Sequence, residues 1–249
     1  MEVWSWLLFL ATVLIGSYIQ TVAGFAMAML MAAIIGGFRV MDVPTLAAVI
    51  SLVTIANVIF AIRGRVKEVQ RRLFVWLALG QIPAIFLGLQ FMTWLDDSSR
   101  WTLEIILGVF ITVGGLSMYL RPHPWQRVSN QGFTAGVGFM GGIMGGMFGA
   151  SGPILGWFAY NQPLPVAAIR ATLLASFILT TSVRTIMVGV EGGLTTNVWL
   201  YSAVALPVVL IGTWAGRTFE PPVSEEGLKK FAYLLLLSMG IWILVTALM

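Results

Sequence analysis

Apolar residues run in long uncharged stretches along most of the chain, and charged residues are confined to short segments between them. Six of these stretches are close to the roughly 20 residues that a helix needs to cross the hydrocarbon of a bilayer. They cover about 43–62, 73–95, 101–120, 166–188, 195–216 and 229–248. The pattern predicts an all-α polytopic membrane protein with no sizeable soluble domain.

Two further stretches, 3–38 and 128–169, carry no charge but are too long for one upright crossing at about 1.5 Å per residue. Small or polar residues interrupt each of them near its middle. These are Gln20, Thr21, Ala23 and Gly24 in the first stretch, and Gly149, Ala150, Ser151, Gly152 and Pro153 in the second. Each stretch could be two crossings joined by a tight turn, one tilted crossing, or a re-entrant hairpin that returns to its own side.

Charge placement favours the hairpins. One loop carries five positive charges, those of Arg63, Arg65, Lys67, Arg71 and Arg72. Positive loops lie in the cytoplasm, so DDSSR (96–100) falls outside and the loop with Arg121 and Arg127 falls inside. If both long stretches are hairpins, the loop with Arg217, Lys229 and Lys230 also falls inside, and the cation-free loop around Glu191 falls outside. We therefore expect both termini outside.

The two halves of the chain correspond at a shift of about 125 residues. PAIFLG (83–88) aligns with PVVLIG (207–212); single matches are Gly24 with Gly149, Asn57 with Ser182, Leu103 with Leu228 and Gly115 with Gly240. Each half holds one broken stretch followed by three spans, so we expect two membrane repeats, 1–124 and 125–249. If each half crosses three times, the second repeat is inverted relative to the first, which is an architecture of secondary transporters.

Composition supports the membrane class and excludes several others. Hydrophobic residues make up 59% of the chain, the mean hydropathy is +0.93, and charged residues make up 10%, against roughly 25% in soluble domains. Cysteine is absent and His123 is the one histidine, so disulfides and cysteine-rich metal sites are excluded. No nucleophile–histidine–acid set, metal cluster or phosphate loop is present. We expect no enzyme activity and no cofactor.

The segment GVGFMGGIMGGMFGASGPILGWFAYNQPLPVAAIRATL (136–173) resembles the second-half glycine motif of the TauE/SafE sulfite-exporter-like permeases. GSYIQTVAGFAMAMLM (16–31) resembles that family's weaker N-terminal copy, although its glycine cluster is reduced to Gly24 followed by Phe25 and Ala26. The resemblance covers nearly the whole chain. It implies export or uptake of sulfite, sulfonates or other small organic anions.

The break GASGP (149–153) predicts an anion site at membrane depth. Pro153 suits the first turn of a helix and Ser151 or Gly152 would be its N-cap. A helix N-terminus presents free N–H groups and a partial positive charge, which favours an anion. Thr21 could cap a second half-helix beginning near Gly24, and the two ends would meet from opposite sides. Close helix packing is an alternative explanation for the glycines of this stretch, which are spaced four residues apart. They form two series: Gly138, Gly142 and Gly146, and Gly141, Gly145 and Gly149.

Few polar side chains lie within the predicted spans: Gln20, Asn57, Gln81, Ser176, Thr180, Thr181 and Ser182. They could donate hydrogen bonds to substrate oxygens, or they could join helices to one another. Arg170 and Arg184 could attract an anion, or they could snorkel to the membrane surface from the ends of their span. No carboxylate lies deep in a span, so we expect no buried proton relay, and the coupling ion stays open.

Together these observations predict a multi-pass inner-membrane carrier that moves a small sulfur-containing or organic anion by alternating access. The expected partners are this anion and the lipid bilayer, not nucleic acid; homo-oligomerisation stays open. Alternatives are an anion channel with the same site and a non-transporting membrane scaffold or sensor component. The predicted substrate-binding residues are Gln20, Thr21, Gly24, Asn57, Gln81, Gly149, Ser151, Gly152, Arg170, Ser182 and Arg184.

Overall fold

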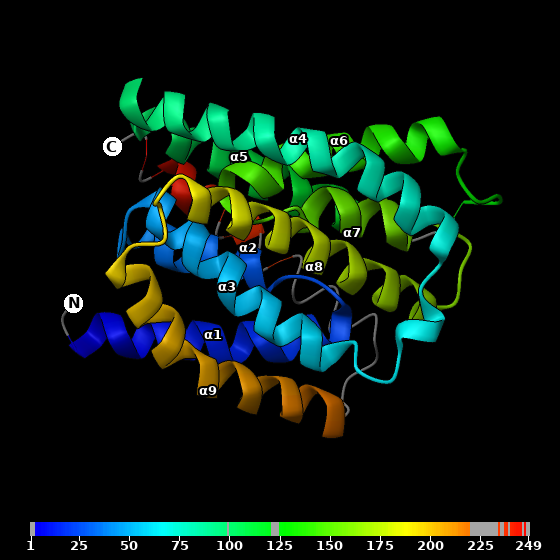
Figure 1. Cartoon of the computed structure of the whole chain (residues 1–249), viewed down its shortest axis with the longest axis horizontal. Helices are drawn as coiled ribbons and strands as arrows, with labels where there is room; N and C mark the ends of the chain where they lie inside the picture. The colour runs from blue at the N-terminus through cyan, green and yellow to red at the C-terminus, as the bar shows by residue number, and fades with distance from the viewer. Residues whose placement is uncertain are drawn as a thin grey trace.

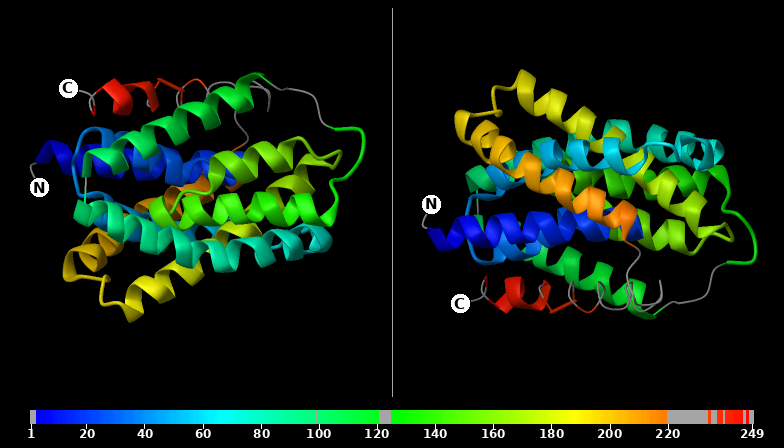
Figure 2. Two further views of the ribbon diagram at one scale, coloured as in Figure 1. Left: turned by 90° about the horizontal axis from the view of Figure 1, so that it is seen from above. Right: turned by 90° about the horizontal axis from the view of Figure 1, so that it is seen from below.

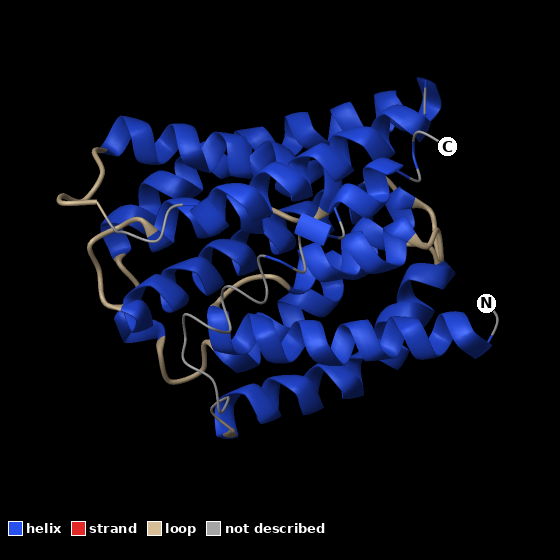
Figure 3. Ribbon diagram, turned by 180° about the vertical axis from the view of Figure 1, so that it is seen from behind, coloured by secondary structure: helices blue, strands red, loops and turns tan. Residues whose placement is uncertain are grey.

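The computed structural model describes residues 3–98, 100–120, 125–219 and 240–245 and the single positions 234, 237, 238 and 247. Every regular element in these residues is helical, and the helices lie side by side along one long axis (Figures 1 and 3). The all-α membrane class is thus confirmed for the described part of the chain. Five of its helices are long and apolar enough to cross a bilayer: α1 (Val3–Ala23), α3 (Val43–Ala61), α4 (Arg71–Ser98), α8 (Val166–Val190) and α9 (Thr196–Thr218).

Most predicted spans correspond to single helices. The spans 43–62, 73–95, 166–188 and 195–216 are α3, α4, α8 and α9, and 101–120 is α5 (Arg100–Leu120). The span 229–248 lies largely outside the described residues. The loop predicted at 96–100 is wrong, because α4 continues through Ser98 and α5 begins at Arg100.

Polar residues set where several helices begin. Asp42 accepts a hydrogen bond from the backbone N–H of Thr45 and so caps α3, and Asn130 caps α6 (Gln131–Phe148) through the N–H of Phe133. Thr195 caps α9 in the same way. Such caps satisfy N–H groups that the first helical turn leaves without partners.

Both long apolar stretches are broken where the sequence indicated. The first consists of α1, α2 (Met27–Met31) and a π-helical turn, η1 (Ala32–Gly36); the second consists of α6 and α7 (Gly152–Tyr160). Gly24 and Gly149 lie at the two breaks with φ of +82° and +67°, a left-handed conformation that glycine adopts without strain.

The chain turns back on itself at each break. The Cα of Gly16 in α1 faces Met27 of α2, and Gly141 of α6 faces the Leu155 side chain of α7. Each broken stretch therefore starts and ends at the same end of the bundle, whereas α3, α4, α5, α8 and α9 run from one end to the other (Figures 1 and 2).

Glycines allow α4 and α6 to pack backbone to backbone. A Cβ on Gly138 would lie 2.3 Å from the carbonyl oxygen of Leu77, and one on Gly142 would lie 2.7 Å from that of Gln81. Gly146 faces Ile85 of α4 in the same way. Close packing is therefore the correct explanation for these three glycines, which the sequence places four residues apart.

Large apolar side chains cover the outer surface of the bundle. Soluble proteins rarely expose apolar patches of more than a few hundred Å², and tryptophans concentrate at membrane–water interfaces. The exposed surface therefore suits lipid. On α4 and α9 its exposed members include Val75, Leu79, Phe86, Phe91, Trp94, Trp199, Leu200, Ile211 and Trp214.

Candidate functional site

The two breaks lie against each other inside the bundle. Gly152 at the start of α7 has no side chain, and a Cβ there would lie 2.6 Å from the sulfur of Met29 in α2. A small buried cavity of about 10 Å³ lies at this point, with room for about one water molecule. Its lining comes from both breaks and from α1, α3 and α8: Gln20, Ala26, Ala28, Met29, Thr54, Gly149, Ser151, Gly152, Phe177 and Thr181.

Four polar side chains line this central cavity, and all four are buried: Gln20, Thr54, Ser151 and Thr181. The Thr54 hydroxyl has no hydrogen-bond partner among the residues that the structure describes. Ser151 is the N-cap residue of α7, but its side chain makes no capping bond. A buried hydroxyl without a partner is costly, so Thr54 is a candidate to bind something in the cavity, and the Ser151 side chain lines the same cavity.

The N-terminus of α7 also lies at the cavity. Gly152 lines it, Pro153 stands in the first turn, and the N–H of Leu155 bonds the Ser151 carbonyl at 3.1 Å. The amides before Leu155 precede the intrahelical ladder and carry the positive end of the helix dipole. The predicted helix start at GASGP is therefore correct.

The capping role predicted for Thr21 is wrong. Thr21 lies inside α1, where its hydroxyl donates to the Ser17 carbonyl at 2.7 Å, rather than at the start of a helix. The next helix, α2, begins after Ala26, which has a φ of +104°, and it has no side-chain cap. It is also only five residues long. Only one of the two expected helix N-termini therefore has the predicted polar start.

Arg184 of α8 lies behind the second break and is fully buried, with 0% of its surface exposed. Its Nε donates to the Gly146 carbonyl at 2.8 Å and its Nη1 to the Ser51 hydroxyl at 3.1 Å; Nη2 faces the Met92 sulfur at 3.8 Å. None of these partners is a carboxylate. Snorkelling is therefore wrong for Arg184: its charge is held at the C-terminus of α6, where the helix dipole is negative.

The Arg184 guanidinium is close to the cavity without lining it. The hydroxyl of Ser51 that it bonds lies 3.3 Å from the position of a Cβ on Gly149, and Gly149 lines the cavity. Thr181, one helical turn before Arg184, lines it as well. The positive charge is thus separated from the cavity by about one layer of atoms.

Arg170 lies elsewhere on α8 and is half-buried. Fourteen residues separate it from Arg184, which is about 21 Å along a helix. A Cβ on Gly24 would lie 3.1 Å from its Cα, so α8 passes directly over the first break. Arg170 does not line the central cavity.

Gln20 and Asn57 belong to one buried hydrogen-bond network, called here the Asn57 network. Gln20 Nε2 donates to Asn57 Oδ1 at 2.9 Å, and Gln20 Oε1 accepts from the N–H of Met27 at 3.2 Å. Asn57 Nδ2 is within bonding distance of three acceptors on α1 and α9: Ser17 O, Thr21 Oγ1 and Thr213 Oγ1, at 3.1, 3.2 and 2.7 Å. Asn57 therefore bonds within the protein and does not line the cavity.

Two further predicted residues lie away from the cavity. Ser182 is half-buried on α8, and its neighbour Thr181 is the residue that lines the cavity. Gln81 is buried in α4 with its backbone against Gly142, and its side-chain amide has no partner in the described part of the chain. Sequence reasoning missed Thr54, although it lies one turn before Asn57 on the same helix face.

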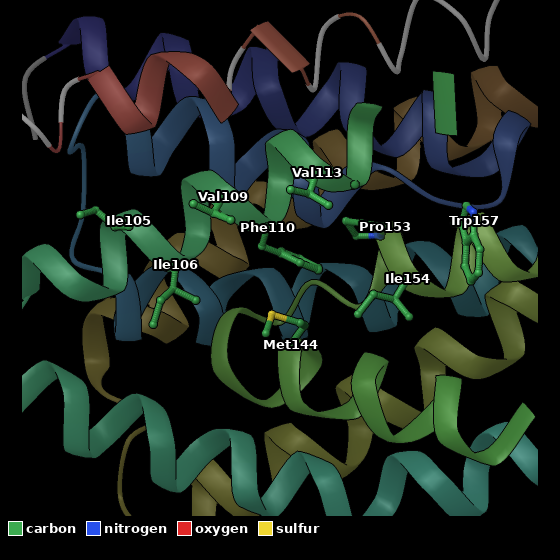
Figure 4. Close-up of a pocket in the computed structure, with 10 residues that line it drawn as sticks. Ile105, Ile106, Val109, Phe110, Val113, Met144, Pro153, Ile154 and Trp157 are labelled. Atoms are coloured by element: carbon green, nitrogen blue, oxygen red, sulfur yellow. The ribbon is translucent and has the colours of Figure 1, made fainter. Parts of the chain in front are cut away.

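A larger groove lies between α5, α6 and α7 and has a volume of about 420 Å³ (Figure 4). Phe110 and Val113 of α5 face Met144, Pro153 and Ile154 across it. The described residues that line it are all apolar or glycine, apart from the indole N–H of Trp157. The groove therefore offers almost nothing to recognise an anion, and the central cavity is the candidate site.

The sequence of the chain is similar to the sequences of known membrane transporters. The sequence model of the family described as "Sulfite exporter TauE/SafE" matches residues 8–243. The probable sulfite/organosulfonate exporter TauE of Cupriavidus necator is 37% identical over 225 residues, covering 90% of this chain and 88% of that protein. The probable inner membrane transporter protein TsaS of Comamonas testosteroni is 26% identical over 174 residues, covering 67% and 71%. No solved structure matches the chain.

Proposed function

The chain belongs to the TauE/SafE sulfite exporter family, and we propose that it is a secondary transporter that carries a sulfite- or sulfonate-like anion across the inner membrane. Its family and relatives are membrane transporters, so the chain is a transporter rather than an enzyme. The relatives' names supply the sulfur-containing substrate class and the inner-membrane location. The central cavity provides the polar groups, and Arg184 the nearby positive charge, that would bind the anion.

The observation that carries this proposal is a buried cation beside a polar cavity. A charge in the interior of a membrane protein is expensive unless an opposite charge offsets it, and the partners of Arg184 among the described residues are all neutral. An anion in the cavity would provide that charge. Thr54, Ser151 and the first amides of α7 would donate hydrogen bonds to its oxygens.

The size of the cavity supports alternating access over an open channel. A sulfite or sulfonate group is larger than the single water that about 10 Å³ accommodates. Binding therefore requires the cavity to widen, and displacement of the flexible Met29 side chain in front of Gly152 is the proposed first step. A site that must open for its substrate fits a carrier.

An inverted repeat is the proposed framework for this movement. Several correspondences between the halves support it. At a shift of about 125 residues, α1, α3 and α4 fall on α6, α8 and α9, and the left-handed Gly24 falls on Gly149. The packing of the two halves corresponds as well. Helix α4 packs against α6 and α8, and its counterpart α9 packs against α1 and α3, which are the counterparts of α6 and α8. In this topology the cation-rich loop after α3 is cytoplasmic and both termini are outside.

A ligand screen by thermal shift tests the proposed substrate class. Purified protein is melted with sulfite, methanesulfonate, taurine, thiosulfate, acetate and chloride at equal ionic strength. The proposal predicts concentration-dependent stabilisation by the sulfur oxyanions, since a ligand that binds only the folded state raises the melting temperature. Equal melting temperatures with all six solutes at 100 mM would contradict it.

A further inference from the structure

A second polar hollow lies between the C-terminal ends of α3 and α9. Its volume is about 490 Å³, and it is lined by Phe60, Arg63, Leu210, Thr213, Trp214 and Arg217. Two of these residues are arginines, and no acidic residue is among the described residues that line the hollow. Arg217 donates from Nη1 to the carbonyl oxygen of Phe60, which holds its guanidinium at the mouth of the hollow. We call this hollow the basic vestibule.

Its inner wall is Thr213, which also belongs to the Asn57 network. The Thr213 hydroxyl accepts from Asn57 Nδ2 at 2.7 Å, and Asn57 Oδ1 accepts from Gln20 Nε2 at 2.9 Å. Gln20 lines the central cavity. A continuous chain of hydrogen-bonded side chains therefore joins the wall of the vestibule to the wall of the cavity.

The same order is found along the length of helix α3. Thr54 lines the central cavity, Asn57 follows one turn later, and Phe60 lines the vestibule after one further turn. Residues three apart on a helix are neighbours. Asn57 thus stands between the two hollows and is fully buried.

We propose that the basic vestibule is a second anion site, which collects the transported oxyanion at the cytoplasmic mouth, and that the Asn57 network is the gate between it and the central cavity. This inference rests on the proposed function. Arg63 and Arg217 attract the anion, because basic surfaces raise the local concentration of anions. The anion enters the cavity when the Asn57–Thr213 and Asn57–Gln20 bonds part.

Cysteine labelling tests the vestibule without requiring transport, because the chain has no native cysteine. Leu210→Cys places a thiol in the vestibule. The rate at which this thiol reacts is measured with two reagents, anionic sulfonatoethyl methanethiosulfonate and cationic trimethylammonioethyl methanethiosulfonate. Each rate is divided by the rate at which the same reagent reacts with a small free thiol in solution. We expect the ratio of anionic to cationic rates to fall about tenfold when Arg63→Gln and Arg217→Gln are added.

The matched control is the pair Arg71→Gln and Arg72→Gln, which removes the same charge from exposed positions on α4. This pair should leave the ratio unchanged, and an equal fall with both pairs would overturn the vestibule. Methanesulfonate should slow labelling in nanodiscs of neutral lipid. If added phosphatidylglycerol abolishes the arginine-dependent preference instead, the hollow holds a lipid headgroup and the proposal is wrong.

The gate is tested by a thiol in the central cavity. We expect Thr54→Cys to react slowly with the anionic reagent, and Asn57→Ala to raise this rate at least fivefold. Thr213→Val removes a single hydroxyl from the network and serves as the second variant should Asn57→Ala not fold. An unchanged rate in the folded variant would refute the gate. Labelling that follows these expectations in a protein that transports no sulfonate would refute the proposed function but not the vestibule.

Discussion

Replacing Arg184 perturbs the proposed site at its most unusual residue. Arg184→Gln removes the buried charge and keeps a polar side chain that can still donate a hydrogen bond. Two short separations join the guanidinium to the cavity: 3.1 Å from Nη1 to Ser51 Oγ, and 3.3 Å from that oxygen to the position of a Cβ on Gly149. An anion in the cavity would therefore lie about 8 Å from the charge. At an effective dielectric constant of about 20 the attraction is about 2 kcal/mol.

This energy corresponds to about a 30-fold loss of anion affinity in Arg184→Gln, since about 1.4 kcal/mol is a factor of ten. Arg184→Lys keeps the charge and should lose less than about fivefold. Affinity for methanesulfonate is measured by calorimetry on detergent-purified protein, with far-ultraviolet circular dichroism to verify folding. Arg72→Gln is the matched control, because it removes one positive charge from an exposed position.

Binding of methanesulfonate by folded Arg184→Gln within twofold of the parent would exclude a role for the buried charge in anion affinity. Arg184 would then act only as a structural cap for the carbonyl of Gly146, to which it donates at 2.8 Å. A melting temperature that falls equally in Arg184→Gln and Arg184→Lys, with unchanged affinity in both, would establish this structural role.

Three other variants test separate parts of the account. Ser151→Leu fills the space before α7 and should abolish anion binding in a protein that still folds; wild-type affinity would remove Ser151 from the site. Gly142→Ala places a Cβ 2.7 Å from the Gln81 carbonyl and should cost about 1–3 kcal/mol of stability. Its control is Gly136→Ala on the same helix, which meets nothing within 4 Å and should stabilise slightly. Equal melting curves for the two variants would contradict the close packing of α4 and α6. A thiol at exposed Glu191→Cys should react only from outside and one at exposed Lys67→Cys only from inside, and the reverse result would end the proposed topology.

The sequence predicted the helices and the two breaks because these depend on local chemistry. Uncharged runs of membrane length give spanning helices, and glycine at a left-handed position ends a helix whatever surrounds it. Gly24, Gly149 and Pro153 are such local signals, and all three stand at a break. The loop at 96–100 was mispredicted because its charged residues do not prevent a helix from continuing.

The site was only partly predictable, because burial and partners depend on the packing of distant helices. Gln20 and Asn57 are both amide residues in apolar spans, so the sequence does not distinguish them. In the structure Gln20 lines the cavity, whereas Asn57 bonds α1 and α9 and does not line it. Position near a span end suggested snorkelling for Arg184, but the glycines of α6 and the small Ser51 leave room for it inside the bundle. Nothing in the sequence marks Thr54 as a cavity residue except that it is a polar residue in an apolar helix.

Counterflow in proteoliposomes measures carrier-type transport of a sulfonate directly. Vesicles are loaded with excess unlabelled methanesulfonate and diluted into a trace of the radiolabelled anion. We expect transient, saturable accumulation of label against its gradient, which is lost in Ser151→Leu and retained in Arg72→Gln. No accumulation above protein-free vesicles would contradict transport of this substrate class, and large single-channel currents without counterflow would show a channel instead of a carrier.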